Sequence, residues 1–352
     1  MSNEILIKNI YYMLSYAFQV LNQNGYKNIE TEKFNNTADM FAAIIQKGIE
    51  NQLKRYLNRE YVIETDSLST LRGKIEINES INQMSFLKKK LICSYDEFSI
   101  DSYMNRILKS TLLLLLKADI SKQRRQGLKS LLVYFSSVHE IDVHHINWKL
   151  QYNQNNQTYQ MLMGICKLII QGLLQTQSNG KSKLMDFLDE QRMCRLYEKF
   201  VLEYYKKHYP KLHANAAMID WDADGETQYL PSMQTDITLF DENQKKILII
   251  DTKYYNKSMQ FQYDRTSYHS GNMYQILSYV KNKESKTECE VSGILLYAKT
   301  DEDITPNQQL TILGNHFEVR TLDLNVDFSE LRKQLDLIVH NNFPASNMLN
   351  YQ

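Results

Sequence analysis

Residues 230–255 have the sequence LPSMQTDITLFDENQKKILIIDTKYY, in which two short apolar runs flank a polar turn. Asp236 lies in the first run, Asp251 closes the second, and Lys253 follows two residues later. Successive side chains of a β-strand point to opposite faces of a sheet, so Asp251 and Lys253 share a face. A hairpin formed by the two runs brings Asp236 beside them. The stretch therefore predicts a sheet edge at which two carboxylates and one ammonium converge.

These side chains suit the hydrolysis of a phosphodiester bond, which needs a nucleophilic water and relief of the charge that builds up on the phosphate. Mg²⁺ held by carboxylates supplies both, and Mn²⁺ could substitute for it. We expect Asp251 to be the central metal ligand, Asp236 the second carboxylate, and the backbone carbonyl of Thr252 a further oxygen ligand. Lys253 is expected to bind the scissile phosphate or the attacking water.

Two helical stretches supply three more candidate residues. The sequence RLYEKFVLEYY, residues 195–205, places Glu198 at the edge of an apolar stripe that is expected to lie on the sheet, within reach of the metal. In NMYQILSYV, residues 272–280, Gln275 and Tyr279 are four positions apart and therefore share a helix face. We expect these two side chains to contact the phosphate or the DNA backbone.

Each of these residues also has an ordinary explanation. An Asp-x-Lys pattern at the end of a strand is most often a solvated turn, and Glu198 alone could equally be a surface charge. Without the hairpin, Gln275 and Tyr279 would be explained by packing on a helix surface. The combination favours a site, because a buried strand has little reason to end in a paired acid and base unless they face one.

The composition indicates a globular protein. The chain has 352 residues, of which 43% are hydrophobic and 23% charged, and its formal net charge is zero. This length accommodates two domains, and the charge balance excludes a uniformly basic nucleic-acid coat. The four cysteines form no CxxC pair, no signal peptide opens the chain, and the longest apolar run, residues 112–116, is too short to span a bilayer. We expect a cytoplasmic protein without membrane contact.

The two halves of the chain differ in the order of their expected elements. Helical periodicity dominates the first half, which also has a small strand region near residues 61–81. The loop-like segment QTQSNGKSK, residues 175–183, precedes a second half with the order α-β-β-β-α-β-β-α. We expect a mixed α+β and α/β protein, in which residues 1–180 form a mainly helical N-terminal domain. Residues 181–352 are expected to form a domain with a central mixed sheet flanked by helices.

Several motifs resemble known protein families. Asp236, Asp251 and Lys253 match the PD-(D/E)xK nuclease core, although Pro231 does not directly precede Asp236 as that pattern requires. The Q-x-x-x-Y pair is similar to that of the RecB-like branch of these nucleases. Four further segments resemble the McrC family: LYEKFV (196–201), LRGKIEI (71–77), CSYDEFSID (93–101) and NRILK (105–109).

The resemblance to the McrC family implies the nuclease subunit of a modification-dependent restriction system, with a restriction-endonuclease-like fold in residues 181–352. Members of this family work with McrB, a hexameric AAA+ GTPase that carries the specificity domain. GTP would therefore act only through the partner, and this sequence has no Walker A pattern. The resemblance also implies that residues 1–180 bind the pore of the GTPase ring and stimulate GTP hydrolysis, which leads to cleavage of double-stranded DNA containing methylcytosine.

Two other functions remain compatible with the same residues. One is a stand-alone DNA repair or recombination nuclease, which would use the same chemistry without a GTPase. The other is a non-catalytic adaptor that activates the AAA+ partner while its nuclease core is vestigial. The intact set of Asp236, Asp251 and Lys253 argues against the adaptor.

Overall fold

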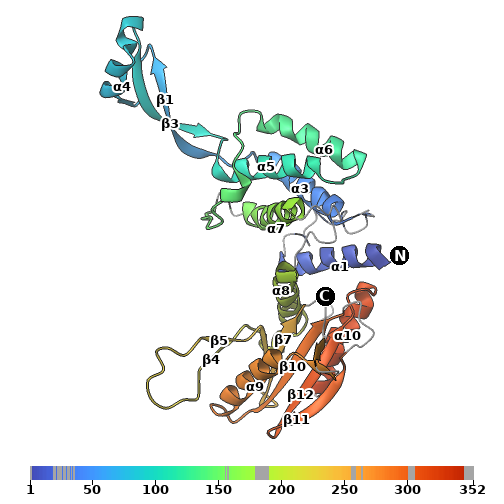
Figure 1. Cartoon of the computed structure of the whole chain (residues 1–352). Coiled ribbons are helices and arrows are strands. Elements are labelled where there is room, and N and C mark those ends of the chain that lie inside the picture. Colours follow the sequence, from blue (N-terminus) through green and yellow to red (C-terminus); the bar gives the residue numbers. More distant parts are fainter. Residues whose placement is uncertain are drawn as a thin grey trace. The chain divides into compact units, whose positions relative to one another are not determined.

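The computed structural model of the chain contains two compact units. The helical unit is Phe34–Phe187, and the sheet unit combines Met1–Lys33 with Leu188–Gln352. Figure 1 shows the course of the chain through both. The structure describes residues 2–18, 21, 26, 29, 32, 34, 36–154, 156, 158–178, 190–254, 259–262, 265–299 and 306–344.

The first helix, α1 (Ser2–Ala17), belongs to the sheet unit. It packs against α8 (Glu190–His208), and Asn9 Nδ2 donates hydrogen bonds of 2.7 Å to the carbonyl oxygens of Leu324 and Val326. The sequence-based division after residue 180 assigns this helix to the N-terminal domain, and the structure differs. Periodicity predicts that a helix buries a stripe, but it does not identify the partner that covers the stripe.

Polar N-caps begin three helices of the helical unit. Asn36, Ser102 and Ser121 each accept a hydrogen bond from the backbone N–H three residues further on, which satisfies a donor that the helix leaves unpaired. The helices of this unit pack on one another through buried apolar side chains. They are α3 (Thr37–Leu53), α5 (Tyr103–Lys117), α6 (Lys122–Leu132) and α7 (Tyr159–Ser178), with short 3₁₀ turns at Val133–Phe135 and Val143–His145.

A two-stranded ribbon projects from these helices (Figure 1). Strands β1 (Glu60–Leu68) and β3 (Leu91–Ser99) pair antiparallel along their whole length, from Glu60 opposite Ser99 to Leu68 opposite Leu91. We call residues 60–99 the finger. Its end is built from β2 (Lys74–Ile75), α4 (Ile77–Asn82) and a 3₁₀ turn at Ser85–Lys88. The small strand region predicted near residues 61–81 is the first part of this finger.

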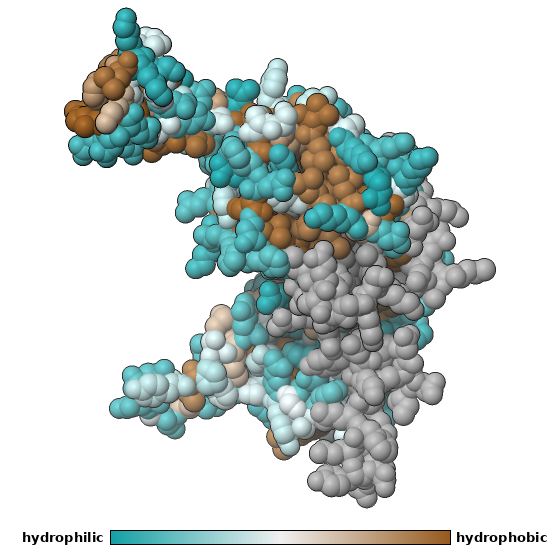
Figure 2. Space-filling model, turned by 45° about the horizontal axis from the view of Figure 1, so that its top comes forward, coloured by the Kyte–Doolittle hydropathy of each residue, from teal (hydrophilic) through white to brown (hydrophobic). Residues whose placement is uncertain are grey.

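The finger exposes large apolar side chains, which Figure 2 shows in brown at its end. Phe86 is 52% exposed and Leu87 is 71% exposed. Exposed apolar groups that gather in one place indicate a contact surface rather than a contribution to the fold. The exposed large hydrophobic residues of the finger are Tyr61, Ile63, Leu71, Ile77, Ile81, Met84, Phe86, Leu87, Leu91 and Phe98.

The sheet unit contains the predicted mixed sheet, with strand order β11-β12-β10-β7-β6. Strands β7, β10 and β12 are parallel to one another, whereas β6 and β11 pair antiparallel at the two edges. The strands are β6 (Ile237–Asp241), β7 (Lys246–Lys253), β10 (Glu290–Ala298), β11 (Gln308–Ile312) and β12 (Asn315–Leu322).

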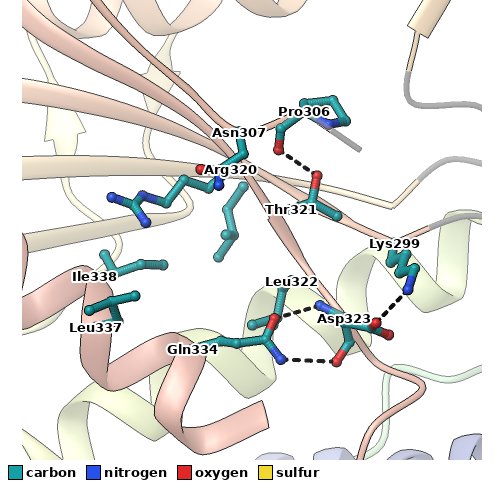
Figure 3. A pocket seen from close by; sticks show the side chains of 11 residues that line it. Lys299, Pro306, Asn307, Arg320, Thr321, Leu322, Asp323, Gln334, Leu337 and Ile338 are labelled. Carbon is teal, nitrogen blue, oxygen red and sulfur yellow. Dashed lines mark hydrogen bonds and ion pairs between the residues drawn. The ribbon is translucent and has the colours of Figure 1, made fainter. Parts of the chain in front are cut away.

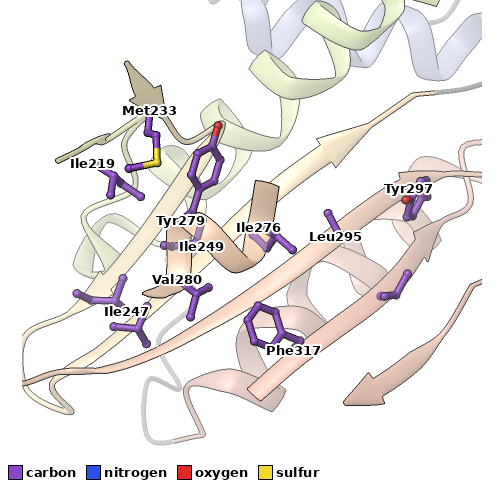
Figure 4. Close-up of a cluster of buried hydrophobic side chains, with 12 residues drawn as sticks. Ile219, Met233, Ile247, Ile249, Ile276, Tyr279, Val280, Leu295, Tyr297 and Phe317 are labelled. Atoms are coloured by element: carbon purple, nitrogen blue, oxygen red, sulfur yellow. The ribbon is translucent and has the colours of Figure 1, made fainter. Parts of the chain in front are cut away.

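Helix α9 (Ser270–Glu284) covers one face of this sheet (Figure 4). Its Ile276 and Val280 pack in one core cluster with Ile249 of β7 and Leu295 of β10. Gly293 permits the close approach, because a Cβ atom there would lie 2.9 Å from both Ile276 Cγ1 and Val280 Cγ2. The alternation of β7 thus directs its odd-numbered side chains toward α9, which fixes the face on which Asp251 and Lys253 lie.

Helix α10 (Phe328–Asn342) lies on the other face, beside Leu296 of β10. Between them is a pocket of about 280 Å³, in which Gln334 accepts a hydrogen bond of 2.8 Å from the backbone N–H of Asp323 (Figure 3). Lys299 Nζ and Asp323 Oδ2 form an ion pair of 2.5 Å at its rim. The pocket contains none of the candidate site residues.

Smaller elements complete the sheet unit. Strand β4 pairs antiparallel with β5, and β8 pairs antiparallel with β9. Among the helices of the described residues, none is long and apolar enough to cross a membrane. The bounds are β4 (Met218–Ile219), β5 (Met233–Gln234), β8 (Met259–Gln262), β9 (Arg265–Tyr268) and a 3₁₀ turn at Pro210–Leu212.

Candidate active site

Asp236 occupies the point at which the chain passes from one sheet to another. After it, β6 pairs with β7, beginning with Ile237 opposite Ile250. Before it, the backbone turns to β4 instead, and the N–H of Thr235 donates to the carbonyl of Ala217 at 2.9 Å. The position of Asp236 is therefore set by backbone pairing on both sides, at the end of the β6–β7 ladder.

The carboxylate of Asp236 is hydrogen-bonded to Thr252, the residue that follows Asp251 in β7. Its Oδ2 accepts hydrogen bonds of 2.7 Å from both the backbone N–H and the hydroxyl of Thr252. Thr252 itself is 7% exposed. The hairpin predicted from the sequence thus brings Asp236 to the second strand, with its direct contact to Thr252.

Asp251 is fully buried, with 0% exposure, at the end of β7 that carries Lys253. Lys253 Nζ lies 2.8 Å from its Oδ2 as an ion pair. Apart from this ion pair, no hydrogen-bond donor among the described residues reaches either carboxylate oxygen. The pKa of Asp251 is raised to about 7, mainly by burial and also by the negative charges of Asp236 and Glu198, while Lys253 acts in the opposite direction.

Glu198 reaches the same group of charges from α8. Its side chain is half-buried, and burial raises the pKa of its carboxyl to about 7, with the charge of Asp236 as the next largest cause. The positive charges of Lys253 and Arg195 act in the opposite direction. Glu198 therefore lies within the electrostatic field of the hairpin residues, and its role as a metal ligand stays a prediction.

Gln275 and Tyr279 connect α9 to Lys253 through a chain of hydrogen bonds. Lys253 Nζ donates to Gln275 Oε1 at 3.1 Å, and Gln275 Nε2 donates to Tyr279 Oη at 2.8 Å. Tyr279 is 7% exposed, and burial raises the pKa of its hydroxyl. Gln275 thus holds the lysine ammonium and Tyr279 holds Gln275, while contact of these two side chains with the phosphate or the DNA backbone stays a prediction.

The residues present suit a divalent cation by their negative charge, although their side chains do not form a preorganised coordination site. No group of three His, Cys, Asp or Glu side chains in the described part of the chain is arranged to hold an ion. Among the described residues, the buried carboxylate of Asp251 has an ion pair with Lys253 but no further hydrogen-bond donor, and the charges of Asp236 and Glu198 raise its pKa. Carboxylate oxygens are ligands that Mg²⁺ binds.

Two side chains of the site were not predicted from the sequence. The hydroxyl of Thr252 bonds to Asp236, although only the carbonyl of Thr252 was expected to act. Arg195 lies one helical turn before Glu198, and its charge lowers the pKa of that carboxyl. The spacing of three residues on one helix could have identified Arg195, since residues three apart lie on the same face.

Comparison with known proteins adds independent information. The family described as "McrBC 5-methylcytosine restriction system component" matches residues 3–298. The chain is 28% identical over 331 residues to a type IV methyl-directed restriction enzyme, EcoKMcrBC of Escherichia coli (strain K12), covering 92% of this chain and 93% of that protein. It shares its fold, with a TM-score of 0.53 and 14% identity, with a chain of the Thermococcus gammatolerans assembly of McrB AAA+ hexamers with bound McrC. That match covers 95% of this chain and 75% of the other.

Proposed function

The chain belongs to the McrBC family of 5-methylcytosine restriction system components, and we propose that it is the McrC-type endonuclease subunit of such a system. It hydrolyses phosphodiester bonds in double-stranded DNA that contains modified cytosine. It acts together with an McrB-type AAA+ GTPase hexamer, whose GTP hydrolysis it stimulates. GTP is bound by that partner, in keeping with the lack of a Walker A pattern in this sequence.

The observation that carries the proposal is the buried carboxylate of Asp251. Lys253 is the one ion-pair partner of this buried charge among the described residues, which makes the charge costly, and a divalent cation would offset that cost. Asp251, Asp236, Glu198 and the carbonyl of Thr252 would hold Mg²⁺, or Mn²⁺ in its place. When bound, the cation supplies electrostatic stabilisation of the charge that develops on the phosphate.

Lys253 is the residue that meets the substrate in this proposal. Its ammonium is held between Asp251 Oδ2 and Gln275 Oε1, which fixes it beside the carboxylates. We assign to it the contact with the scissile phosphate or with the attacking water. The water oxygen bonds to phosphorus as the water gives up a proton, one P–O ester bond breaks, and the departing oxygen takes up a proton.

The finger is the part of the chain that we assign to the GTPase. Its apolar side chains are exposed at its end, where they contribute little to the fold (Figure 2). In the Thermococcus gammatolerans assembly, a protein named McrC is bound to McrB hexamers. A narrow projection with an apolar end suits the pore of a ring, as the McrC resemblance implies for the N-terminal part of the chain.

The alternative functions are less well supported. A stand-alone repair nuclease would not account for a finger that exposes Phe86 and Leu87. A vestigial adaptor would not need Asp251, Lys253 and Gln275 to keep their mutual contacts.

Reconstitution tests the proposal. The chain is incubated with methylated or unmethylated DNA and Mg²⁺, with and without an McrB-type partner and GTP. We expect cleavage of methylated DNA only when the partner, GTP and Mg²⁺ are all present, and faster GTP hydrolysis when the chain is added to the partner. Efficient cutting by the chain alone, without GTP, would point to the stand-alone nuclease. Stimulated GTP hydrolysis without any cleavage would point to the adaptor.

The contact between Gln275 and Lys253 predicts a specific kinetic effect. Gln275→Ala should lower kcat for cleavage about tenfold with little change in KM, because it loosens the lysine rather than a contact to DNA. Tyr279→Phe, which removes only the hydroxyl that orients Gln275, should have a smaller effect of the same kind. Ser278→Ala on the same helix is the control. A rise in KM with unchanged kcat would instead favour direct contact of these residues with DNA.

A further inference from the structure

Thr252 donates two hydrogen bonds to the carboxylate of Asp236. Its hydroxyl and its backbone N–H both donate to Oδ2 of Asp236 at 2.7 Å. The side chain is almost fully buried, with 7% exposure for the residue. Two short bonds to a single oxygen define the orientation of a carboxylate more closely than one bond does.

The backbone explains why Thr252 meets a side chain at this position. The β6–β7 ladder ends at Ile237 opposite Ile250, and the chain before it turns away so that Thr235 pairs with Ala217. Thr252 lies beyond the last paired residue of β7 on that edge, where a buried N–H needs another acceptor. The carboxylate of Asp236 is that acceptor. The hydrogen bond from the backbone N–H would therefore form with any non-proline residue at position 252.

The hydroxyl is the part that depends on the identity of the residue. A carboxylate has about four lone-pair positions on its two oxygens, and the amide and hydroxyl of Thr252 occupy those of Oδ2. A cation would then be left with Oδ1. The β-branched side chain also has few rotamers, so its hydroxyl is held in place before any ligand arrives.

We propose that the hydroxyl of Thr252 is a positioning group for the divalent-cation site: it orients Asp236 so that the carboxylate offers a single oxygen, Oδ1, to the cation. This inference rests on the proposed function, because it assumes that Asp236 is a ligand. It gives the side chain of Thr252 a role separate from that of its backbone carbonyl. A small hydroxyl residue is therefore required between Asp251 and Lys253.

Calorimetric titration of the full-length chain with Ca²⁺ tests the proposal without requiring activity. Thr252→Val keeps the shape and the amide but removes the hydroxyl, and it should raise the dissociation constant about tenfold. Thr252→Ser should bind nearly as tightly as the unchanged chain. Cleavage by the assembled complex should follow the same order, with the valine variant needing more Mg²⁺ for half-maximal rate. Thr321→Val, which removes a hydroxyl that bonds to the carbonyl of Pro306 at 2.7 Å, is the matched control.

The outcomes separate this inference from the function on which it rests. If Thr252→Val and Thr252→Ser bind Ca²⁺ equally well while Asp251→Asn does not bind, the positioning role is wrong and the metal site stands. If Asp251→Asn also binds Ca²⁺ and its complex cuts DNA, the proposed site itself is wrong. Should the valine variant not fold, Thr252→Ala, which also lacks the hydroxyl, replaces it in the comparison with serine.

Discussion

Asp251→Asn is expected to lower DNA cleavage by the assembled complex by at least about a thousandfold, because it removes the central carboxylate of the site. GTP hydrolysis by the partner should continue to be stimulated, since the finger is unchanged. The measurement is cleavage of methylated DNA under single-turnover conditions, with GTP turnover followed in the same reaction. Cleavage that persists in the asparagine variant would show that the active site lies elsewhere.

The same substitution should stabilise the metal-free protein. Burial raises the pKa of Asp251 from its ordinary value of 3.8 to about 7. A raised pKa in the folded state means that stability is fully present below pH 3.8 and is lost as the pH rises through about 7. Asparagine carries no charge, so the free energy of unfolding of the variant should not fall over this pH range. Above pH 7 it should exceed that of the unchanged chain by on the order of a few kcal/mol.

A second buried aspartate of the same hairpin provides the control. Asp241 is 6% exposed, and its carboxylate accepts hydrogen bonds from the backbone N–H groups of Asn243 and Gln244. Asp241→Asn should therefore destabilise the fold, since it weakens satisfied bonds, while leaving cleavage intact. Equal stability changes for the two variants, measured by urea denaturation between pH 4 and 8, would contradict the raised pKa of Asp251.

Replacing both Phe86 and Leu87 with serine should abolish stimulation of the GTPase, and cleavage should fall about a hundredfold with it. These side chains are 52% and 71% exposed at the end of the finger, so the fold does not need them. Their apolar area is available to a partner, and a few such residues usually carry most of the energy of an interface. The assay is GTP turnover of the partner against the concentration of added chain.

Two other exposed apolar residues of the helical unit serve as the matched control for this prediction. Val133 and Tyr134 are 71% and 57% exposed and lie outside the finger. Their replacement by serine should leave GTP turnover and cleavage unchanged. Loss of stimulation in this control, or full stimulation by the finger variant, would assign the partner contact to a different surface. Ca²⁺ binding by the finger variant should remain normal, because its carboxylate site is intact.

The arrangement of the hairpin side chains could be predicted from the sequence because it depends on local periods. The two-residue period of a strand puts Asp251 and Lys253 on one face, and their ion pair follows. The four-residue spacing of Gln275 and Tyr279 likewise predicts their mutual hydrogen bond. The contact of Gln275 with Lys253 could not be predicted in the same way. It depends on how closely α9 lies on the sheet, which is set by packing such as that at Gly293 of β10.

Features that depend on pairing between distant segments could not be predicted. The hydrogen bond from Thr252 to Asp236 arises because the pairing of β6 with β7 begins only at Ile237, directly after Asp236. The residue at which this pairing begins cannot be predicted from the spacing of residues in the sequence. The return of α1 to the sheet unit depends on Asn9 meeting the carbonyl of Leu324, far along the chain. The strand β3 (Leu91–Ser99) was also missed, because its two buried residues, Ile92 and Cys93, are consecutive and lack the apolar alternation that marks a half-buried strand.

Proton release on cation binding is the sharpest test for a divalent-cation site at Asp251 and Glu198. The pKa of Asp251 and that of Glu198 are raised to about 7, so near pH 6.5 the metal-free carboxyls hold protons that a cation must displace. Ca²⁺ titrations of the full-length chain in buffers of different ionisation enthalpy should show release of about one proton per ion, and affinity that rises with pH. The Asp251→Asn variant should show neither. Binding without proton release, or equal binding by the variant, would contradict a cation site at these carboxylates.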